Sequence, residues 1–318
     1  MIVIPALHPA REIVTVVPSL RPGQVQRSST TIESVGGKAI NVARFASLMG
    51  GHVRLLVLAD ADLRGWIERD SVIGGQSFAT VVESAVASRI DVAIVEPGRV
   101  TVINGAGADP GPAAAALVDL TLATLRPDDV LVLAGSLPDR MEGTLGRLIS
   151  GARAKQARTV VDASGPWLTE ALLAHPDAIK INREEAEAVL AAADDPATEF
   201  LQDHEAPWAA VRAIAARGLP DGGGLVAVSD GADGLRALIG GEAWRVTPPA
   251  DLSVVNPLGA GDAVTAGLAL AFAGGASGLD GLVLGTAMAA ARLGHLDSRL
   301  DPADVAGLRR LVRFQRVD

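Results

Sequence analysis

Short apolar runs that alternate with helical patterns dominate the middle of the chain. Apolar runs at 2–4 and 53–58 precede this region, and a regular series follows. In that series the predicted strands lie at 130–134, 159–162, 178–181 and 225–229, and the predicted helices near 112–125, 140–157, 167–174, 183–192 and 206–217. This alternation favours an α/β fold with a doubly wound, mainly parallel sheet and helices on both faces.

Two early pairs of segments do not fit inside such a sheet. Residues 12–17 and roughly 26–34 are β-prone and polar, and residues 89–96 and 99–103 turn at Pro97-Gly98. We interpret both pairs as ribbons with a solvated face. The chain is therefore expected to be one domain, 1–318, with a small β-sheet lid at about 9–34 and 88–104. Residues 193–206 are predicted to form an acidic loop, and 278–294 and 302–313 two helices.

A glycine turn leads into a predicted buried helix at Asn256-Pro-Leu-Gly-Ala-Gly-Asp-Ala263, whose apolar continuation reaches Phe272. Free N–H groups at such a helix start point at one spot, which suits an anion such as phosphate. Asp262 lies at the edge of that spot, where it could take a proton from an attacking nucleophile. On this stretch alone the alternative stays open that Asp262 only complements the helix dipole and the glycines only make a turn.

Composition excludes several classes of function. The 318 residues carry a net charge of −9 with 3% aromatic residues, so a nucleic-acid surface is not expected. The absence of Cys excludes disulfides and thiolate sites, and the five His residues lack zinc-ligand spacing. No secretory signal and no membrane-length apolar stretch is visible, so we expect a cytoplasmic protein without a membrane partner.

Polar residues follow several of the predicted strands. These strand ends lie at 134–138, 161–165, 180–185 and 228–234. In a doubly wound sheet, ligands bind beyond the carboxyl ends of the strands. The convergence of these segments predicts a binding site at one edge of the sheet.

Individual residues near this edge each have a second interpretation. Lys38 opposes the dipole of the helix that it starts, so an anion is expected to compensate it, although a solvated Lys is the alternative. Asn41, one turn on, suits a sugar hydroxyl or is an ordinary polar position. Arg89 begins a ribbon strand, where a phosphate fork competes with a plain exposed charge.

The nucleotide side of the predicted site is similarly ambiguous. Asn182 and Glu185 form an Asn-x-x-Glu capping pattern, which is compatible with Glu185 lying near a hydrated Mg²⁺. Ser229, Gly231 and Gly234 form either a simple turn or a backbone cradle for phosphates. Neither a Walker loop nor a Gly-x-Gly-x-x-Gly fingerprint after an N-terminal strand occurs, which disfavours a dehydrogenase.

These segments together resemble the ribokinase-like (pfkB) carbohydrate kinases over most of the chain. GGKAINVAR at 36–44 and NPLGAGDAVTAG at 256–267 are similar to the two signatures of that family. AGSLPDR at 134–140, VDASG at 161–165 and SRIDVAIVE with TVIN within 88–104 are similar to segments of its 1-phosphofructokinase and tagatose-6-phosphate kinase branch.

The resemblance implies a kinase that transfers the γ-phosphate of ATP to a sugar hydroxyl with Mg²⁺. It also implies a β-lid that often mediates dimers, so a homodimer through the lid is one expectation. Asp262 would be the base, and the backbone of Gly259, Ala260 and Gly261 the anion hole. The implied substrate-binding residues are His8, Gly36, Gly37, Lys38, Asn41 and Arg89. The implied nucleotide-binding residues are Lys180, Asn182, Ser229, Gly231 and Gly234, with Glu185 organising the metal.

Departures from the family pattern concentrate on the sugar side. His8 stands where an Asp usually contacts sugar hydroxyls, and Ala59-Asp60-Ala61 replaces an expected glycine pair. Other departures are Asp91, Gly105-Ala106 and, on the nucleotide side, Ile181. We therefore expect a kinase of a phosphorylated ketohexose whose sugar preference has drifted. The alternatives are a ribose or nucleoside kinase on the same fold, or a non-catalytic binder of sugar phosphates.

Overall fold

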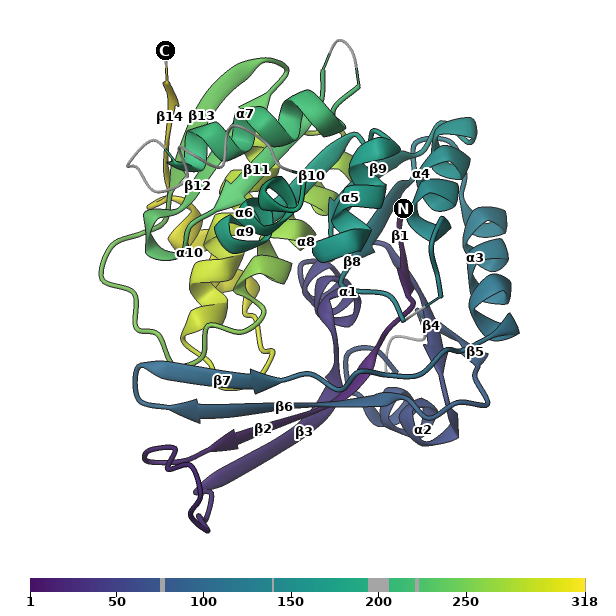
Figure 1. The fold of residues 1–318 in the computed structure, drawn as a ribbon. Coiled ribbons are helices and arrows are strands. Elements are labelled where there is room, and N and C mark those ends of the chain that lie inside the picture. The colour runs from purple at the N-terminus through teal and green to yellow at the C-terminus, as the bar shows by residue number, and fades with distance from the viewer. Residues whose placement is uncertain (75–77, 139, 194–205, 221–222, 318) are drawn as a thin grey trace.

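A ten-stranded sheet forms the centre of the computed structural model, which describes residues 1–74, 78–138, 140–193, 206–220 and 223–317 (Figure 1). From one edge to the other its strands are β14 (Arg313–Val317), β13 (Glu242–Thr247), β12 (Leu235–Ile239), β11 (Leu225–Ser229), β10 (Ala178–Asn182), β9 (Arg158–Asp162), β8 (Val130–Ala134), β1 (Ile2–Ala6), β4 (Val53–Ala59) and β5 (Ala79–Glu83).

The strands from β11 to β5 are all parallel, whereas β12, β13 and β14 add antiparallel pairs at one edge. The first strand of the chain, β1, lies between β8 and β4, so the order of the strands reverses there. Such a reversal opens a crevice at the carboxyl ends of the strands. The predicted fold class is confirmed.

Helices cover both faces of the sheet, and each face has its own core. One face carries α1 (Lys38–Leu48), α8 (Ala260–Ala273), α9 (Gly278–Leu293) and α10 (Pro302–Arg309). The other carries α3 (Pro112–Thr124), α4 (Thr144–Ala154), α5 (Gly165–Leu173), α6 (Arg183–Ala191) and α7 (Ala206–Gly218). Ile2 and Ile4 of β1 pack into the first core and Val3 into the second, because successive side chains of a strand point to opposite faces.

A separate four-stranded sheet projects from the rest of the molecule (Figure 1). Its order is β3 (Thr30–Gly36), β2 (Ala10–Val16), β6 (Arg89–Glu96) and β7 (Arg99–Ile103), as expected from the two ribbons. On its inner face Val14, Ala93 and Val95 pack with Leu258 and Leu296. These contacts place the small sheet over the start of α8.

The structure corrects one predicted helix and adds elements that the sequence pattern did not indicate. The helix predicted at 302–313 ends at Arg309, and Arg313 begins β14, which pairs with Thr247 of β13. The pairing of β14 depends on a partner strand distant in sequence. The helix α2 (Ala61–Arg69) and the strands β5, β12 and β13 were not predicted. The predicted loop at 193–206 falls largely on 194–205, outside the described residues.

No helix within the described ranges is long and apolar enough to cross a bilayer.

Candidate active site

Asp162, the last residue of β9, is the centre of a buried charge cluster at the carboxyl edge of the sheet. Its side chain is completely buried. It accepts hydrogen bonds from Lys38 Nζ at 2.8 Å, from Lys180 Nζ at 3.1 Å and from Thr265 Oγ1 at 2.6 Å. Burial would raise the pKa of Asp162, but the two ammonium groups and the hydroxyl hold that pKa below its usual range. The cluster therefore keeps Asp162 ionised.

Lys38 connects this cluster to α6. As the first residue of α1, its Nζ lies 2.8 Å from Asp162 Oδ1 and 2.8 Å from Glu185 Oε1. The compensation expected for a cation at a helix start is thus supplied by two carboxylates of the protein. Burial lowers the pKa of Lys38, but the attraction of Asp162 and Glu185 raises it by more. The net pKa of Lys38 therefore lies above its usual range. Lys38 is a charged group held in a fixed position.

The capping pattern at the start of α6 is confirmed. Asn182 Oδ1 accepts from the Glu185 backbone N–H at 2.7 Å, and Glu185 Oε2 accepts from the Asn182 N–H at 2.9 Å. Because Oε1 of Glu185 binds Lys38, the two oxygens of one carboxylate have different partners. Glu185 thus both caps a helix and belongs to the charge cluster.

Asp262 lies in the first turn of α8 and is 6% exposed. Asn41 of α1 donates from Nδ2 to Asp262 Oδ2 at 2.9 Å. Burial and the neighbouring Asp162 raise the pKa of Asp262 to about 6, although Lys38, Asn41 and Lys180 oppose that rise. A carboxylate with a pKa near neutrality has the properties of a general base at physiological pH.

The N-terminus of α8 is built to leave its backbone accessible. Gly259 precedes the helix with φ +79°, a left-handed conformation that favours glycine, and no side chain caps this end. A Cβ at Gly261 would come within 2.7 Å of Lys180 Nζ. The absence of side chains here brings an ammonium group close to the helix N-terminus, a combination that favours an anion.

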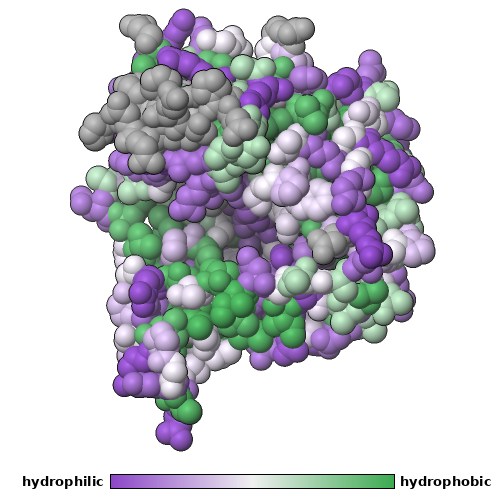
Figure 2. All heavy atoms as spheres, viewed as in Figure 1, coloured by the Kyte–Doolittle hydropathy of each residue, from purple (hydrophilic) through white to green (hydrophobic). Residues whose placement is uncertain are grey.

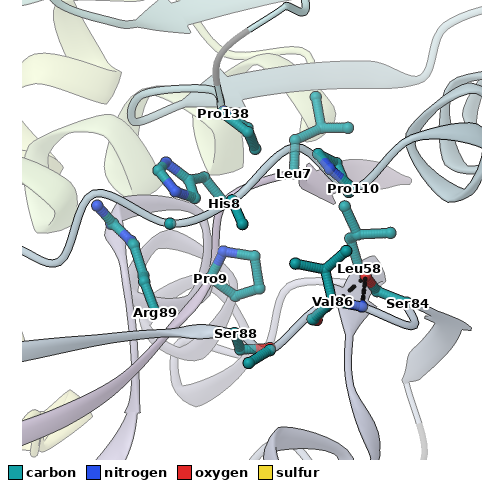
Figure 3. Close-up of a pocket in the computed structure, with 13 residues that line it drawn as sticks. Leu7, His8, Pro9, Leu58, Ser84, Val86, Ser88, Arg89, Pro110 and Pro138 are labelled. Carbon is teal, nitrogen blue, oxygen red and sulfur yellow. Dashed lines mark hydrogen bonds between the residues drawn. The ribbon is translucent and has the colours of Figure 1, made fainter.

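A second group of predicted residues surrounds a small cavity of about 30 Å³ at the end of β1 (Figure 3). His8 Nδ1 lies 3.1 Å from Ser136 Oγ, which follows β8. Arg89 Nη2 lies 3.2 Å from Asp91 Oδ2. Figure 3 shows His8 and Arg89 on the same side of the cavity. Arg89 is thus held by a carboxylate of its own strand, and it lines the same cavity as His8.

The predicted nucleotide residues lie side by side on two neighbouring strands. Asn182 at the end of β10 pairs in register with Ser229 at the end of β11. Ser229 is followed by a short 3₁₀ turn, Gly231–Asp233, and by Gly234 with φ +81°. This turn lies beside the residues that follow Lys180. Figure 2 shows the hollow that this edge forms, with hydrophilic side chains inside it and hydrophobic ones along the small sheet.

Three residues of this site were not among the predicted ones. Asp162 belongs to a strand end that the sequence had indicated, but its role in joining two lysines was not predicted. Thr265 lies one turn after Gly261 and reaches Asp162, and Ser136 contacts His8. A polar Thr within an otherwise apolar helix was the one local signal for its place. The contact between Ser136 and His8 joins residues 128 positions apart, so no local pattern indicates it.

Comparison with known proteins supports the family that the two sequence motifs indicate. A family model described as pfkB family carbohydrate kinase matches residues 10–304. The 1-phosphofructokinase of Rhodobacter capsulatus is 34% identical over 313 residues, which cover 96% of this chain and 95% of the relative. The 1-phosphofructokinase of Xanthomonas campestris pv. campestris is 32% identical and covers 92% of this chain and 91% of its own.

Solved structures show the same fold. Phosphofructokinase-2 from Escherichia coli, crystallised in complex with substrates and products, superimposes with a TM-score of 0.84 over 97% of this chain and 98% of its own, at 24% identity. The family expected from the two signature motifs is thus confirmed. This chain belongs to the pfkB family of carbohydrate kinases, and it is an enzyme that transfers phosphate to a sugar hydroxyl.

Proposed function

We propose that this kinase phosphorylates a phosphorylated ketohexose with ATP, as a 1-phosphofructokinase or tagatose-6-phosphate kinase does, and that Asp262 is its general base. The observation that carries the proposal is the position of Asp262: a buried carboxylate of raised pKa in the first turn of α8, next to glycines that leave the helix N-terminus open. Similarity to curated 1-phosphofructokinases supports the substrate class.

The proposed reaction needs one proton transfer. The attacking sugar hydroxyl loses its proton to Asp262 as the oxygen bonds to phosphorus, and the bond from phosphorus to the leaving ADP oxygen breaks. We assign the backbone N–H groups of Gly259, Ala260 and Gly261 to the charge that moves during this step. The N–H of Ala260, which donates to Pro257 O at 3.3 Å in the structure, would exchange that bond for one to the phosphate. Most of the rate enhancement would come from positioning and from this electrostatic stabilisation.

On the sugar side, we propose that Gly36, Gly37 and Asn41 contact the sugar and that Arg89 binds its phosphate. Asn41 already holds Asp262, so it can orient both the base and a hydroxyl. The pair between Arg89 and Asp91 is compatible with this role, because a phosphate can share the other donors of the guanidinium fork. His8, next to Ser136, is proposed to set sugar preference.

On the nucleotide side, we propose that Lys180, Asn182 and the turn containing Ser229, Gly231 and Gly234 contact ATP. Within the described ranges, no group of three or more His, Asp or Glu residues is arranged to hold a metal. Mg²⁺ keeps several waters and binds through one or two carboxylates together with phosphate oxygens, so a single carboxylate of the protein is enough for the proposed site. Glu185 is the proposed carboxylate, and the ion would neutralise phosphate charge when bound.

We also propose that two copies of the chain associate through the outer face of the small sheet. Ile90 and Ile103 on that face are 49% and 59% exposed, and Val92 lies opposite Ile103 in the register. An apolar sheet face of this kind is typical of an interface. The proposed place of action is the cytoplasm.

An ADP-release screen with Mg²⁺ and ATP tests the substrate class. Fructose 1-phosphate, fructose 6-phosphate, tagatose 6-phosphate, fructose, ribose and adenosine would be compared at matched concentrations. We expect kcat/KM for one phosphorylated ketohexose to exceed that for fructose by at least about tenfold. A charge-assisted bidentate bond between an arginine and the sugar phosphate is strong enough to change kcat/KM by that factor. Preference for ribose or adenosine would instead indicate a ribose or nucleoside kinase.

The variant Arg89→Met sharpens the same test. It should raise KM for the phosphorylated sugar about tenfold or more and leave KM for ATP nearly unchanged, because it removes a phosphate contact only. Arg99→Met is a matched control, since Arg99 lies on the same small sheet with a 65% exposed side chain and pairs with Glu96. Equal KM values for Arg89→Met and the wild type would contradict the assignment of Arg89.

A further inference from the structure

We propose that Arg292 is a positioning residue of this enzyme: a permanently charged group of the protein that fixes the loop before α8 and places positive charge behind the phosphate-binding N-terminus of that helix. This inference rests on the proposed function, because it assigns Arg292 a role through Asp262 and the 259–261 backbone. Nothing in the sequence pattern indicated it, since Arg292 occupies the last turn of a predicted helix.

The burial of Arg292 is unusual for a charged side chain. It is 2% exposed and is the largest fully buried side chain among the described residues. Its Nη1 donates to the backbone carbonyl oxygens of His295 at 2.6 Å and Asn256 at 3.5 Å, while its Nε has no hydrogen-bond partner. Within the described ranges no carboxylate oxygen lies within 4.0 Å of its guanidinium.

A buried cation without a close anion destabilises a fold, so its partners should explain its presence. Those partners are backbone dipoles on two loops. Asn256 reinforces the same junction, because its Nδ2 donates to Leu296 O at 2.9 Å and its Oδ1 accepts from Leu258 N–H at 3.1 Å. Arg292 and Asn256 therefore bind the 256–258 loop to the 295–296 loop.

The loop that Arg292 holds leads directly to the anion-binding helix start. A Cβ at Gly259 would lie 3.7 Å from Arg292 Nε, so the guanidinium is next to the residue that precedes α8. The backbone of Ala260 is tied to the same loop, since its N–H donates to Pro257 O at 3.3 Å. A positive charge at this place adds to the dipole of α8, which already favours an anion at its N-terminus.

Arg292 interacts electrostatically with Asp262 and with other nearby carboxylates. Burial lowers the pKa of Arg292, and attraction to Glu12, Asp297 and Asp262 opposes that effect. An arginine nevertheless stays protonated in proteins. Arg292 also lines a cavity of about 330 Å³ between the small sheet, α1 and the loop after α9, together with Glu12, Arg44, Asn256 and Leu258. This cavity offers a small cation a way to the space next to Arg292.

The test compares Arg292→Met, which keeps much of the apolar volume without the charge, with the wild-type enzyme. We expect kcat to fall at least tenfold, while KM for ATP and for sugar changes less than threefold, because the substrate contacts stay in place. The acidic limb of the kcat–pH profile should shift to higher pH, because losing the positive charge of Arg292 raises the pKa of Asp262. Lys38, Lys180 and Asn41 would then be left to oppose the effect of Asp162 on that pKa. Arg245→Met is the control: Arg245 also has a buried Nε without a partner, but it lies on β13, which three strands separate from β9 and Asp162.

Chemical rescue separates a charge effect from loss of folding. In Arg292→Ala, millimolar guanidinium chloride should restore at least fivefold in kcat with saturation, at an ionic strength kept constant with choline chloride, and the wild type should not respond. If neither variant folds, Arg292→Lys provides the test. It keeps the charge and should fold, and its kcat should be lower than that of the wild type but still measurable.

Unchanged kcat and an unchanged pH profile in Arg292→Met would overturn the proposal. So would a loss of kcat that guanidinium does not restore and that follows the folded fraction, or full activity in Arg292→Lys with a wild-type profile in Arg292→Met. Asp262→Asn is measured in parallel. Activity in Asp262→Asn would disprove the proposed base, whereas an inactive Asp262→Asn beside a fully active Arg292→Met would disprove the role of Arg292 alone.

Discussion

Two buried carboxylates of the same cluster, Asp162 and Asp262, have pKa values shifted in opposite directions. The difference arises from their partners, since Asp162 contacts two ammonium groups and Asp262 contacts an amide. Both are buried, and the charge of Asp162 itself makes ionisation of Asp262 harder. Such a division leaves one carboxylate permanently charged and the other ready to accept a proton near neutral pH.

This division predicts the pH dependence of turnover. A base must be ionised to accept a proton, so kcat/KM should decrease as pH falls through about 6, the pKa of Asp262. Well below that pKa the decrease should approach tenfold per pH unit. The measurement is a profile from pH 5 to 8.5 with saturating ATP. Asp262→Asn should lose roughly a hundredfold or more in kcat and show no acidic limb, while ATP affinity stays nearly intact.

A flat wild-type profile between pH 5 and 7 would rule out Asp262 as the base, provided that the protein stays folded over that range.

At the scale of elements, α8 and the small sheet divide the work of the site. The start of α8 carries the proposed base, Asp262, and the open backbone, and it is held by α1 through the bond between Asn41 and Asp262. The inner face of the small sheet contacts Leu258 and Leu296, which flank the loop that leads to α8. On the outer face, Arg11 lies over the ring of Trp66 of α2, whereas Ile90 and Ile103 are exposed.

The exposed outer face predicts that Ile103→Asp weakens self-association. If two copies pack these faces together, a carboxylate at a position that is 59% exposed in one chain becomes buried in the dimer, which is costly. Sedimentation velocity at micromolar concentration should show a dimer for the wild type and a larger monomer fraction for the variant. Leu173→Asp is the control, because Leu173 is 77% exposed on α5, away from the small sheet.

Identical sedimentation of wild type and Ile103→Asp would count against the interface, and a loss of dimer in Leu173→Asp would point to a different one.

At the scale of the whole molecule, burial of the ionised carboxylate of Asp262 reduces the free energy of unfolding. The pKa of Asp262 is about 6 in the fold, against an ordinary value of 3.8. The folded state therefore binds more protons between these values, and its stability falls as pH rises through this window. The rest of the structure has to offset this cost at the pH at which the enzyme works.

Asp262→Asn should therefore be more stable than the wild type at pH 8. The neutral amide can still accept the bond from Asn41, and it removes the cost of a buried charge. The upper limit of the gain is about 3 kcal/mol, since one pKa unit corresponds to about 1.4 kcal/mol. Urea unfolding at pH 8 measures the gain. The gain should shrink as pH falls from about 6 and be lost below pH 4, where the wild-type carboxyl is protonated in both states. A variant that is less stable than wild type at pH 8 would contradict this account.

Local patterns in the chain are enough to predict the alternation of strands and helices, the polar strand ends and the glycine turn before α8. These features depend on local chemistry: apolar runs form buried strands, and glycines without side chains leave a helix start open. The same local reasoning found Asp262, Lys38 and the capping pair Asn182 and Glu185. That reasoning did not predict the strands β12 to β14, because their pairing depends on neighbouring strands in the sheet.

Which charged groups contact one another depends on how the chain folds. Asp162 contacts Lys38 across 124 positions of sequence and Thr265 across 103, and Arg292 reaches Asn256 across 36. A pKa and a buried ion cluster depend on distances of a few ångströms between residues that the chain brings together from different strands and helices, and no periodicity in the sequence encodes those distances.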